Sequence, residues 1–94
     1  MIGVLATLKI NPGKNKDFED AARRMVKAVE ENEAGNLYYN FYKGEDDTTY
    51  IVMERYKSQE DLDLHGKTEH MRSIGGDMGK YMSGPPLIKV LESL

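Results

Sequence analysis

The chain contains no cysteine and no tryptophan among its 94 residues. The absence of cysteine excludes disulfide bonds, thiolate metal sites and a cysteine nucleophile together. It is consistent with a reducing compartment, and we expect a cytoplasmic protein. Because this length is typical of one domain, we predict a single domain over residues 1–94.

The sequence also lacks an excess of charge of one sign and a long apolar run. Thirteen Lys and Arg residues oppose 16 Asp and Glu residues, which gives a net charge of −3. This balance provides no basic surface for nucleic acid or for an anionic membrane. The apolar residues 1–10 carry no basic leader and are too few for a signal peptide or a membrane span. We therefore expect neither nucleic acid nor a membrane as a partner.

The motifs that bind nucleotides and activate serine nucleophiles are absent as well. The chain has no glycine-rich phosphate loop, no dinucleotide fingerprint and no Gly-x-Ser-x-Gly elbow. It is also too short to enclose a flavin or a nicotinamide dinucleotide within one subunit. We therefore expect no tightly bound organic cofactor, so that any chemistry proceeds without one or with one supplied from outside.

The apolar residues that are present follow two periodicities. Alternation, as at Ile2, Val4 and Ala6, predicts a strand over residues 2–10. We predict further strands over residues 37–42, which are rich in aromatics, and over residues 49–56 and 87–91. Helical spacing predicts a helix over residues 15–33, with Gly35 as its stop.

A second helical region follows the third predicted strand. Ser58 can cap its start, with Asp61 three residues on. Gly75 and Gly76 interrupt the later part at a cost of about 1 kcal/mol each relative to alanine. They would either open space for a ligand beneath the helix or form a weak point. Residues 84–86, Gly-Pro-Pro, end the helix.

The order βαββαβ predicts an α+β fold, a four-stranded antiparallel sheet with two helices on one face. The other face would expose Leu5, Ile51 and Met53 among other apolar residues. Such a patch is too large for an ordinary monomer. A two-fold dimer that pairs sheet against sheet would cover it, and we predict a homodimer.

His65 and His70 are the only histidines and the first candidates for acid–base chemistry. Their five-residue spacing corresponds to about 500° of helical rotation, which does not place both on one face. A break near Gly66 would let them converge; otherwise they are polar residues of a junction between helices. No third ligand stands at a characteristic spacing, so we predict no metal site.

Glu54 and Tyr56 share one face of the third predicted strand. Because apolar residues flank Glu54, we expect a half-buried carboxyl group with a raised pKa. An ion pair with a nearby Lys or Arg is the slightly favoured alternative to catalysis. The six tyrosines of the chain are mostly expected in core or interface positions. A subset that lines an apolar pocket would suit a planar aromatic ligand.

Four segments together resemble the antibiotic biosynthesis monooxygenase domain family. They are residues 33–39, 54–58, 62–70 and 83–86, and they follow the family's order over nearly the whole chain. The resemblance implies a ferredoxin-like βαββαβ unit that dimerises into an α+β barrel. It also implies a pocket between sheet and helices in each subunit.

This family is functionally mixed, and the resemblance implies several activities. Some members are cofactor-independent oxygenases that act on polycyclic phenols and quinols. Another member is an isomerase that acts on a phosphorylated compound, and the paired histidines of this enzyme are similar to those of the present chain. Distant relatives degrade haem with a first-strand Asn, a Trp and a His. Here Ala6 stands at the Asn position and no Trp exists, which argues against haem. Tyr38 stands where the family often has Arg, which disfavours a phosphorylated substrate, and Tyr56 stands where many members have Trp.

The leading hypothesis is a cofactor-independent monooxygenase that oxidises a small phenol or quinol with O₂. His65 is the first choice of base, and His70, Glu54, Tyr56 and Tyr39 are predicted to contact or position the substrate. One alternative is an isomerase of a small hydroxy-ketone, which would use the same histidines through an enediol. The other is a non-catalytic ligand-binding dimer.

Overall fold

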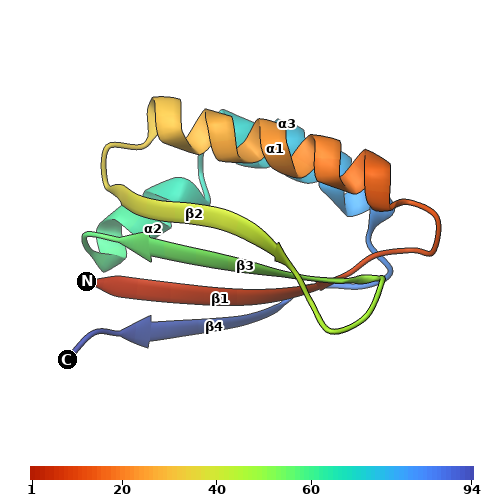
Figure 1. The fold of residues 1–94 in the computed structure, drawn as a ribbon. Helices are drawn as coiled ribbons and strands as arrows, with labels where there is room; N and C mark the ends of the chain where they lie inside the picture. The colour runs from red at the N-terminus through yellow and green to blue at the C-terminus, as the bar shows by residue number, and fades with distance from the viewer.

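The computed structural model describes all 94 residues. Its elements follow the order β1 (Ile2–Lys9), α1 (Asn15–Asn32), β2 (Asn36–Lys43), β3 (Thr49–Tyr56), α2 (Gln59–His65), α3 (Glu69–Tyr81) and β4 (Leu87–Glu92) (Figure 1). The strand boundaries agree with the predicted ones to within one residue at each end. The second helical region differs, because the residues between His65 and Glu69 divide it into two helices.

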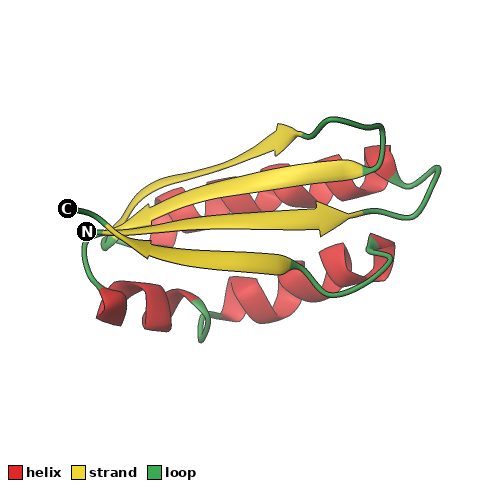
Figure 2. Cartoon of the chain, turned by 90° about the horizontal axis from the view of Figure 1, so that it is seen from below, coloured by secondary structure: helices red, strands yellow, loops and turns green.

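The four strands form one antiparallel sheet in the order β2-β3-β1-β4. In its centre Ala6 pairs with Val52 on one side and with Ile88 on the other. Figure 2 shows that no helix lies in front of the sheet when it is seen from below, so this face is free of helices. The predicted α+β architecture is therefore confirmed, with three helices in place of two.

The core lies between this face and the helices. The even-numbered residues of β1, from Ile2 to Leu8, point into it, as their alternation predicts. Phe18 and Val29 of α1 are fully buried against them. Each such side chain contributes about 1.5–3 kcal/mol to folding. This packing fixes α1 and α3 above the sheet.

Hydroxyl caps determine where α2 and α3 begin. The Ser58 hydroxyl accepts a hydrogen bond from the Asp61 amide at 3.2 Å, as the sequence predicts. The Thr68 hydroxyl accepts one from the Met71 amide, also at 3.2 Å. Each cap stabilises its helix by about 1 kcal/mol. The second cap starts a new helix just after His65 and so redirects the chain between the two histidines.

Gly35 does not end α1 in the predicted way. The helix ends at Asn32, because the next residue, Glu33, has an extended backbone (φ −117°, ψ 93°). The only positive φ in the chain belongs to Gly13. Gly35 is required for close approach, because a Cβ there would collide with the Asp61 side chain. Its carbonyl accepts a hydrogen bond from the Lys57 amide at 2.9 Å. This contact holds the end of α1 against the start of α2.

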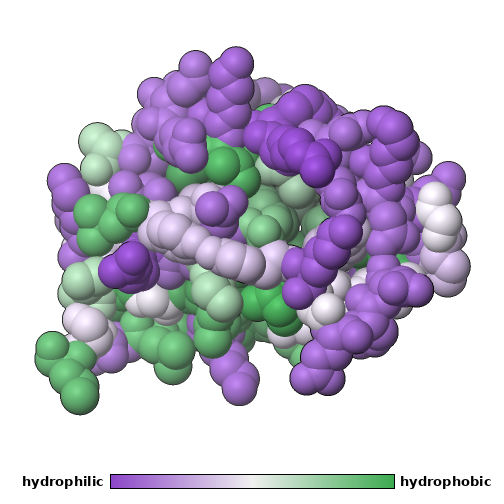
Figure 3. Space-filling view, in the orientation of Figure 1, coloured by the Kyte–Doolittle hydropathy of each residue, from purple (hydrophilic) through white to green (hydrophobic).

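The opposite face of the sheet carries no helix. Leu5 and Met53 on this face are 38% and 40% exposed, and Leu87 and Leu91 of β4 are more exposed still. Hydrophobic groups gather along the lower side in Figure 3, below the hydrophilic surface of α1. We call the sheet side without helices the open face. None of the helices combines the length and the apolar character that a membrane crossing requires.

Candidate functional site

The largest apolar cavity lies between the sheet and α3 and has a volume of about 550 Å³. Its walls come from every strand and from all three helices, and most of its lining residues are apolar. Gly75 lines it, whereas Gly76 does not. Its groups able to exchange protons are Tyr39, Glu54 and His65, and it contains no Lys or Arg side chain. We call this space the main cavity.

His65 is the last residue of α2 and is buried. Its Nδ1 lies 2.9 Å from both carboxylate oxygens of Glu33. An ionised carboxylate only accepts hydrogen bonds, so a neutral His65 ring carries its proton on Nδ1. Its Nε2 is then free to accept a proton and lies 3.9 Å from Glu54 Oε1 on the side of the main cavity.

His70, the second residue of α3, meets the same glutamate from another direction. Its Nε2 lies 2.5 Å from Glu33 Oε2, and the two imidazole centroids are 6.4 Å apart. The break at Gly66 thus brings the histidines together through a shared carboxylate rather than on one helix face. The alternative, in which both histidines are only polar residues of a junction between helices, does not describe this arrangement, because they share Glu33 as a partner.

Glu33 is the residue that sequence reasoning missed. It belongs to a segment that supports the family resemblance, yet nothing in the local pattern distinguishes it from the exposed Glu30 and Glu31. Its inward direction follows from the extended backbone after α1 and from the close approach at Gly35.

Glu54 lies on the wall of the main cavity and is largely buried, and this burial raises its pKa as expected. The Tyr56 hydroxyl donates a hydrogen bond to Oε1 at 2.7 Å. The ion pair with a Lys or Arg that the sequence slightly favoured is absent, and His65 is the basic neighbour instead. The reason is that β3 turns this side chain inward, away from the charged surface.

The two candidate tyrosines flank the His65 ring at centroid distances of 5.4 Å for Tyr39 and 5.5 Å for Tyr56. Burial, reinforced by the charge of Glu54, raises the pKa of both phenols, so both stay neutral. Tyr39 lines the main cavity. Tyr56 and His70 do not line it: Tyr56 lies beneath Glu54, and His70 lies behind Glu33. Their contact with a substrate stays a prediction.

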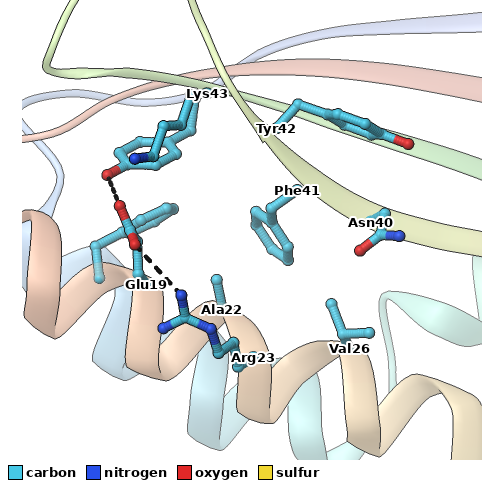
Figure 4. A pocket seen from close by; sticks show the side chains of 10 residues that line it. Glu19, Ala22, Arg23, Val26, Asn40, Phe41, Tyr42 and Lys43 are labelled. Atoms are coloured by element: carbon cyan, nitrogen blue, oxygen red, sulfur yellow. Dashed lines mark hydrogen bonds and ion pairs between the residues drawn. The ribbon is translucent and has the colours of Figure 1, made fainter.

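A second cavity of about 310 Å³ lies between α1 and β2 (Figure 4). Its polar side is occupied by Glu19, which accepts a hydrogen bond from Tyr50 at 2.5 Å and pairs with Arg23 at 3.4 Å. It contains no histidine, and we call it the α1–β2 cavity. Its one carboxylate, Glu19, is already bonded to Tyr50 and Arg23, so it offers less acid–base chemistry than the main cavity.

Glu33, His65 and His70 also form the one group of three or more potential ligands close enough to share a metal ion. Their ligand atoms all lie within 4.8 Å of one another. The spacing in the sequence offered only His65 and His70 as ligands. Glu33, at the distant end of α1, supplies the third.

Comparison with known proteins relates this chain to one group. The family model for antibiotic biosynthesis monooxygenase matches residues 1–75. The Bacillus subtilis (strain 168) protein named "Putative monooxygenase YcnE" is 25% identical over 85 residues, which cover 90% of each chain.

Solved structures share the fold over nearly the full length. A "putative antibiotic biosynthesis monooxygenase" from Caulobacter crescentus CB15 is 36% identical with a TM-score of 0.94, and the match covers 99% of this chain and 89% of that one. Rv0793 from Mycobacterium tuberculosis is 24% identical with a TM-score of 0.88, and the match covers 99% of this chain and 94% of that one. The latter likeness shows the fold alone.

Proposed function

Because the chain belongs to the antibiotic biosynthesis monooxygenase family, we propose that it is a cofactor-independent monooxygenase that oxidises a small phenol or quinol with O₂. The observation that carries this proposal is the composition of the main cavity. Its walls are apolar, its acid–base groups gather around His65, and it has no cationic side chain. A neutral planar aromatic compound with one hydroxyl group at His65 suits such a space.

His65 would act as the general base. Glu33 accepts the Nδ1 proton, which fixes the tautomer and leaves Nε2 directed toward the cavity side. The Glu54 carboxylate beside Nε2 would stabilise the imidazolium that forms when the substrate hydroxyl loses its proton. A positioned base of this kind accelerates proton removal by about 10²- to 10⁴-fold.

The oxidation needs no external reductant. The phenolate passes one electron to O₂, and the phenoxyl radical and superoxide then join through a new C–O bond. The peroxide takes the proton back from His65. Loss of the ring C–H proton and cleavage of the O–O bond release water and leave a quinone. A phenol and O₂ thus give a quinone and water, and a quinol and O₂ give a hydroxyquinone and water.

The absence of Lys and Arg from the main cavity argues against a phosphorylated substrate. An isomerase of an uncharged hydroxy-ketone would use the same base without O₂. Substrate-dependent proton exchange under anaerobic conditions, without oxygen uptake under air, would replace the oxygenase proposal by this one.

The open face supports a homodimer. It combines Leu5 and Met53 of the central strands with Leu87 and Leu91 of β4, all exposed. Sheet-to-sheet pairing of two copies would bury this surface and close an α+β barrel. Sedimentation velocity at micromolar concentration should show a single dimeric species, and a monomer there would contradict the pairing.

The functional test is oxygen uptake with a menadiol-type quinol. We expect His65→Ala to lower the rate by about 100-fold or more, because the general base is lost. We expect a smaller loss for His70→Ala, which acts only through Glu33. Gln59→Ala, an exposed change in the same helix, is the control and should leave the rate unchanged. A reaction without protein corrects for autoxidation, and wild-type rates in both histidine variants would rule out the mechanism.

A further inference from the structure

The cluster of Glu33, His65 and His70 has a second capability that the oxygenase proposal does not use. We propose that these three residues bind one divalent transition-metal ion, of the class of Zn²⁺ or Co²⁺. The site lies on the Nδ1 side of His65, whereas Glu54 lies on the Nε2 side. The inference goes beyond the proposed function, and its test does not require turnover.

The donor atoms already converge. Glu33 Oε2 lies 2.9 Å from His65 Nδ1 and 2.5 Å from His70 Nε2, and all three ligand atoms fall within 4.8 Å of one another. Donors on one zinc ion lie about 3 to 3.5 Å apart, given metal–ligand bonds of about 2.0–2.2 Å. To admit an ion, the carboxylate therefore has to withdraw by less than about 1 Å, and the two histidine nitrogens have to lie within about 4 Å of each other, the span that two such bonds allow. Two imidazoles and one carboxylate are a common donor set for such ions.

Each ligand is held by a different element. Glu33 follows the end of α1, His65 ends α2, and His70 lies in the first turn of α3. The three side chains are only 8%, 6% and 11% exposed, so water screens the charges poorly. Such convergence of buried ligands from three helices is favourable for binding, because the folded chain has already ordered them.

The charge around the cluster favours a cation. Glu33 and Glu54 are two largely buried carboxyl groups, and neither forms an ion pair with a Lys or Arg. The two histidines are their only basic neighbours. A divalent ion beside Glu33 would supply positive charge that the surrounding side chains do not provide.

Glu54 completes the arrangement as an outer partner. A histidine that binds a metal through one nitrogen usually donates its other N–H to a carboxylate or carbonyl group. Glu54 Oε1 lies 3.9 Å from His65 Nε2 and is itself held by the Tyr56 hydroxyl at 2.7 Å. A metal on Nδ1 would place the proton of His65 on Nε2, directed at this carboxylate.

This outcome has a consequence for the proposed base. A His65 ring with a metal on Nδ1 and a proton on Nε2 has no lone pair left to accept a substrate proton. Ion binding would therefore inhibit the oxygenase reaction described above. This consequence rests on the proposed function, whereas ion binding itself does not.

The direct test is titration of the tag-free, chelator-treated protein with Co²⁺, followed by visible absorption. We expect one ion per chain with the d–d bands of a site that has nitrogen ligands, and displacement of Co²⁺ by Zn²⁺. Glu33→Gln and His70→Ala should each weaken binding by at least about 10-fold, because loss of even an outer partner of a metal ligand costs about 10- to 100-fold in affinity. Glu69→Gln is the matched control, since this exposed carboxylate pairs only with Arg72 and should bind Co²⁺ like the wild type.

The two histidines permit a second measurement on the wild-type protein, which does not depend on whether a variant folds. Long-range ¹H–¹⁵N correlation spectra with and without Zn²⁺ should show coordination at Nδ1 of His65 and at Nε2 of His70. No binding of Co²⁺ at millimolar concentration, or Zn²⁺ shifts that leave both rings unchanged, would overturn the proposal. Equal affinity of Glu33→Gln and the wild type would overturn it as well.

Discussion

Two carboxylate–tyrosine pairs occur in this small protein, one beside each cavity. In the main cavity Glu54 accepts a hydrogen bond from Tyr56, and in the α1–β2 cavity Glu19 accepts one from Tyr50. The distances are similar, at 2.7 and 2.5 Å. Both tyrosines come from β3, and both glutamates project into the space between sheet and helices.

The pairs differ in their third member and in their exposure. Glu19 is 26% exposed and pairs with Arg23. Because arginine is always charged, this ion pair is a structural contact that does not exchange protons. Glu54 is 10% exposed and faces His65, whose charge changes with its protonation. The same hydrogen bond therefore serves structure where arginine accompanies it. Where the buried His65 accompanies it, as at Glu54, the same hydrogen bond would serve the proposed proton transfer.

The comparison predicts unequal effects of removing the two carboxylate charges. Glu54→Gln should lower oxygen uptake with a quinol by about 10- to 100-fold, because the imidazolium of His65 loses its neighbouring anion. Glu19→Gln should leave this rate within about twofold of the wild type. Steady-state kinetics with both variants test the difference, and equal rates in the two would remove the functional distinction between the cavities.

A second prediction concerns stability. Tyr56→Phe should reduce the free energy of unfolding by about 1–3 kcal/mol, because it leaves a buried acceptor on Glu54 without its donor. Tyr50→Phe should cost about 0.5–1 kcal/mol, since Arg23 and solvent remain available to Glu19. Urea denaturation curves with unchanged slopes would provide both values. A larger loss for Tyr50→Phe would reverse the assignment of the buried pair.

The smallest predicted effect tests the wall of the main cavity. Gly75→Ala and Gly76→Ala both replace a glycine within α3 and should each stabilise the helix by up to about 1 kcal/mol. A methyl group at residue 75 meets only Met25 Cε at 3.9 Å, and one at residue 76 meets nothing within 4 Å. Gly75→Ala alone should raise KM for a bulky quinol by about 3- to 10-fold. An unchanged KM would show that the substrate does not reach this wall.

Much of the fold could be predicted because its signals are local. Alternating apolar residues at Ile2, Val4 and Ala6 define β1 and its buried face. The hydroxyl of Ser58 caps α2 through an amide only three residues away. The inward direction of Glu54 was also accessible, because it follows from the period of two along β3. Such features depend on backbone geometry within a few residues.

The candidate site was only partly accessible by the same reasoning. His65, Glu54 and Tyr39 were among the candidates that residue type suggested, and all three line the main cavity. The partner of Glu54 was wrong, and Tyr56 and His70 do not reach the cavity wall. These differences depend on which side chains meet across elements, which periodicity does not specify.

The sequence by itself determined the four strands and the first helix, the buried face of β1 and the short list of groups able to exchange protons. Tertiary structure alone decided that Glu33 joins His65 and His70, residues that lie more than 30 positions further along the chain. The physical reason is that a carboxylate is directed inward by the end of α1 and its packing against α2, a contact between distant segments. Periodicity describes one element at a time, whereas this site exists only where three helix ends meet.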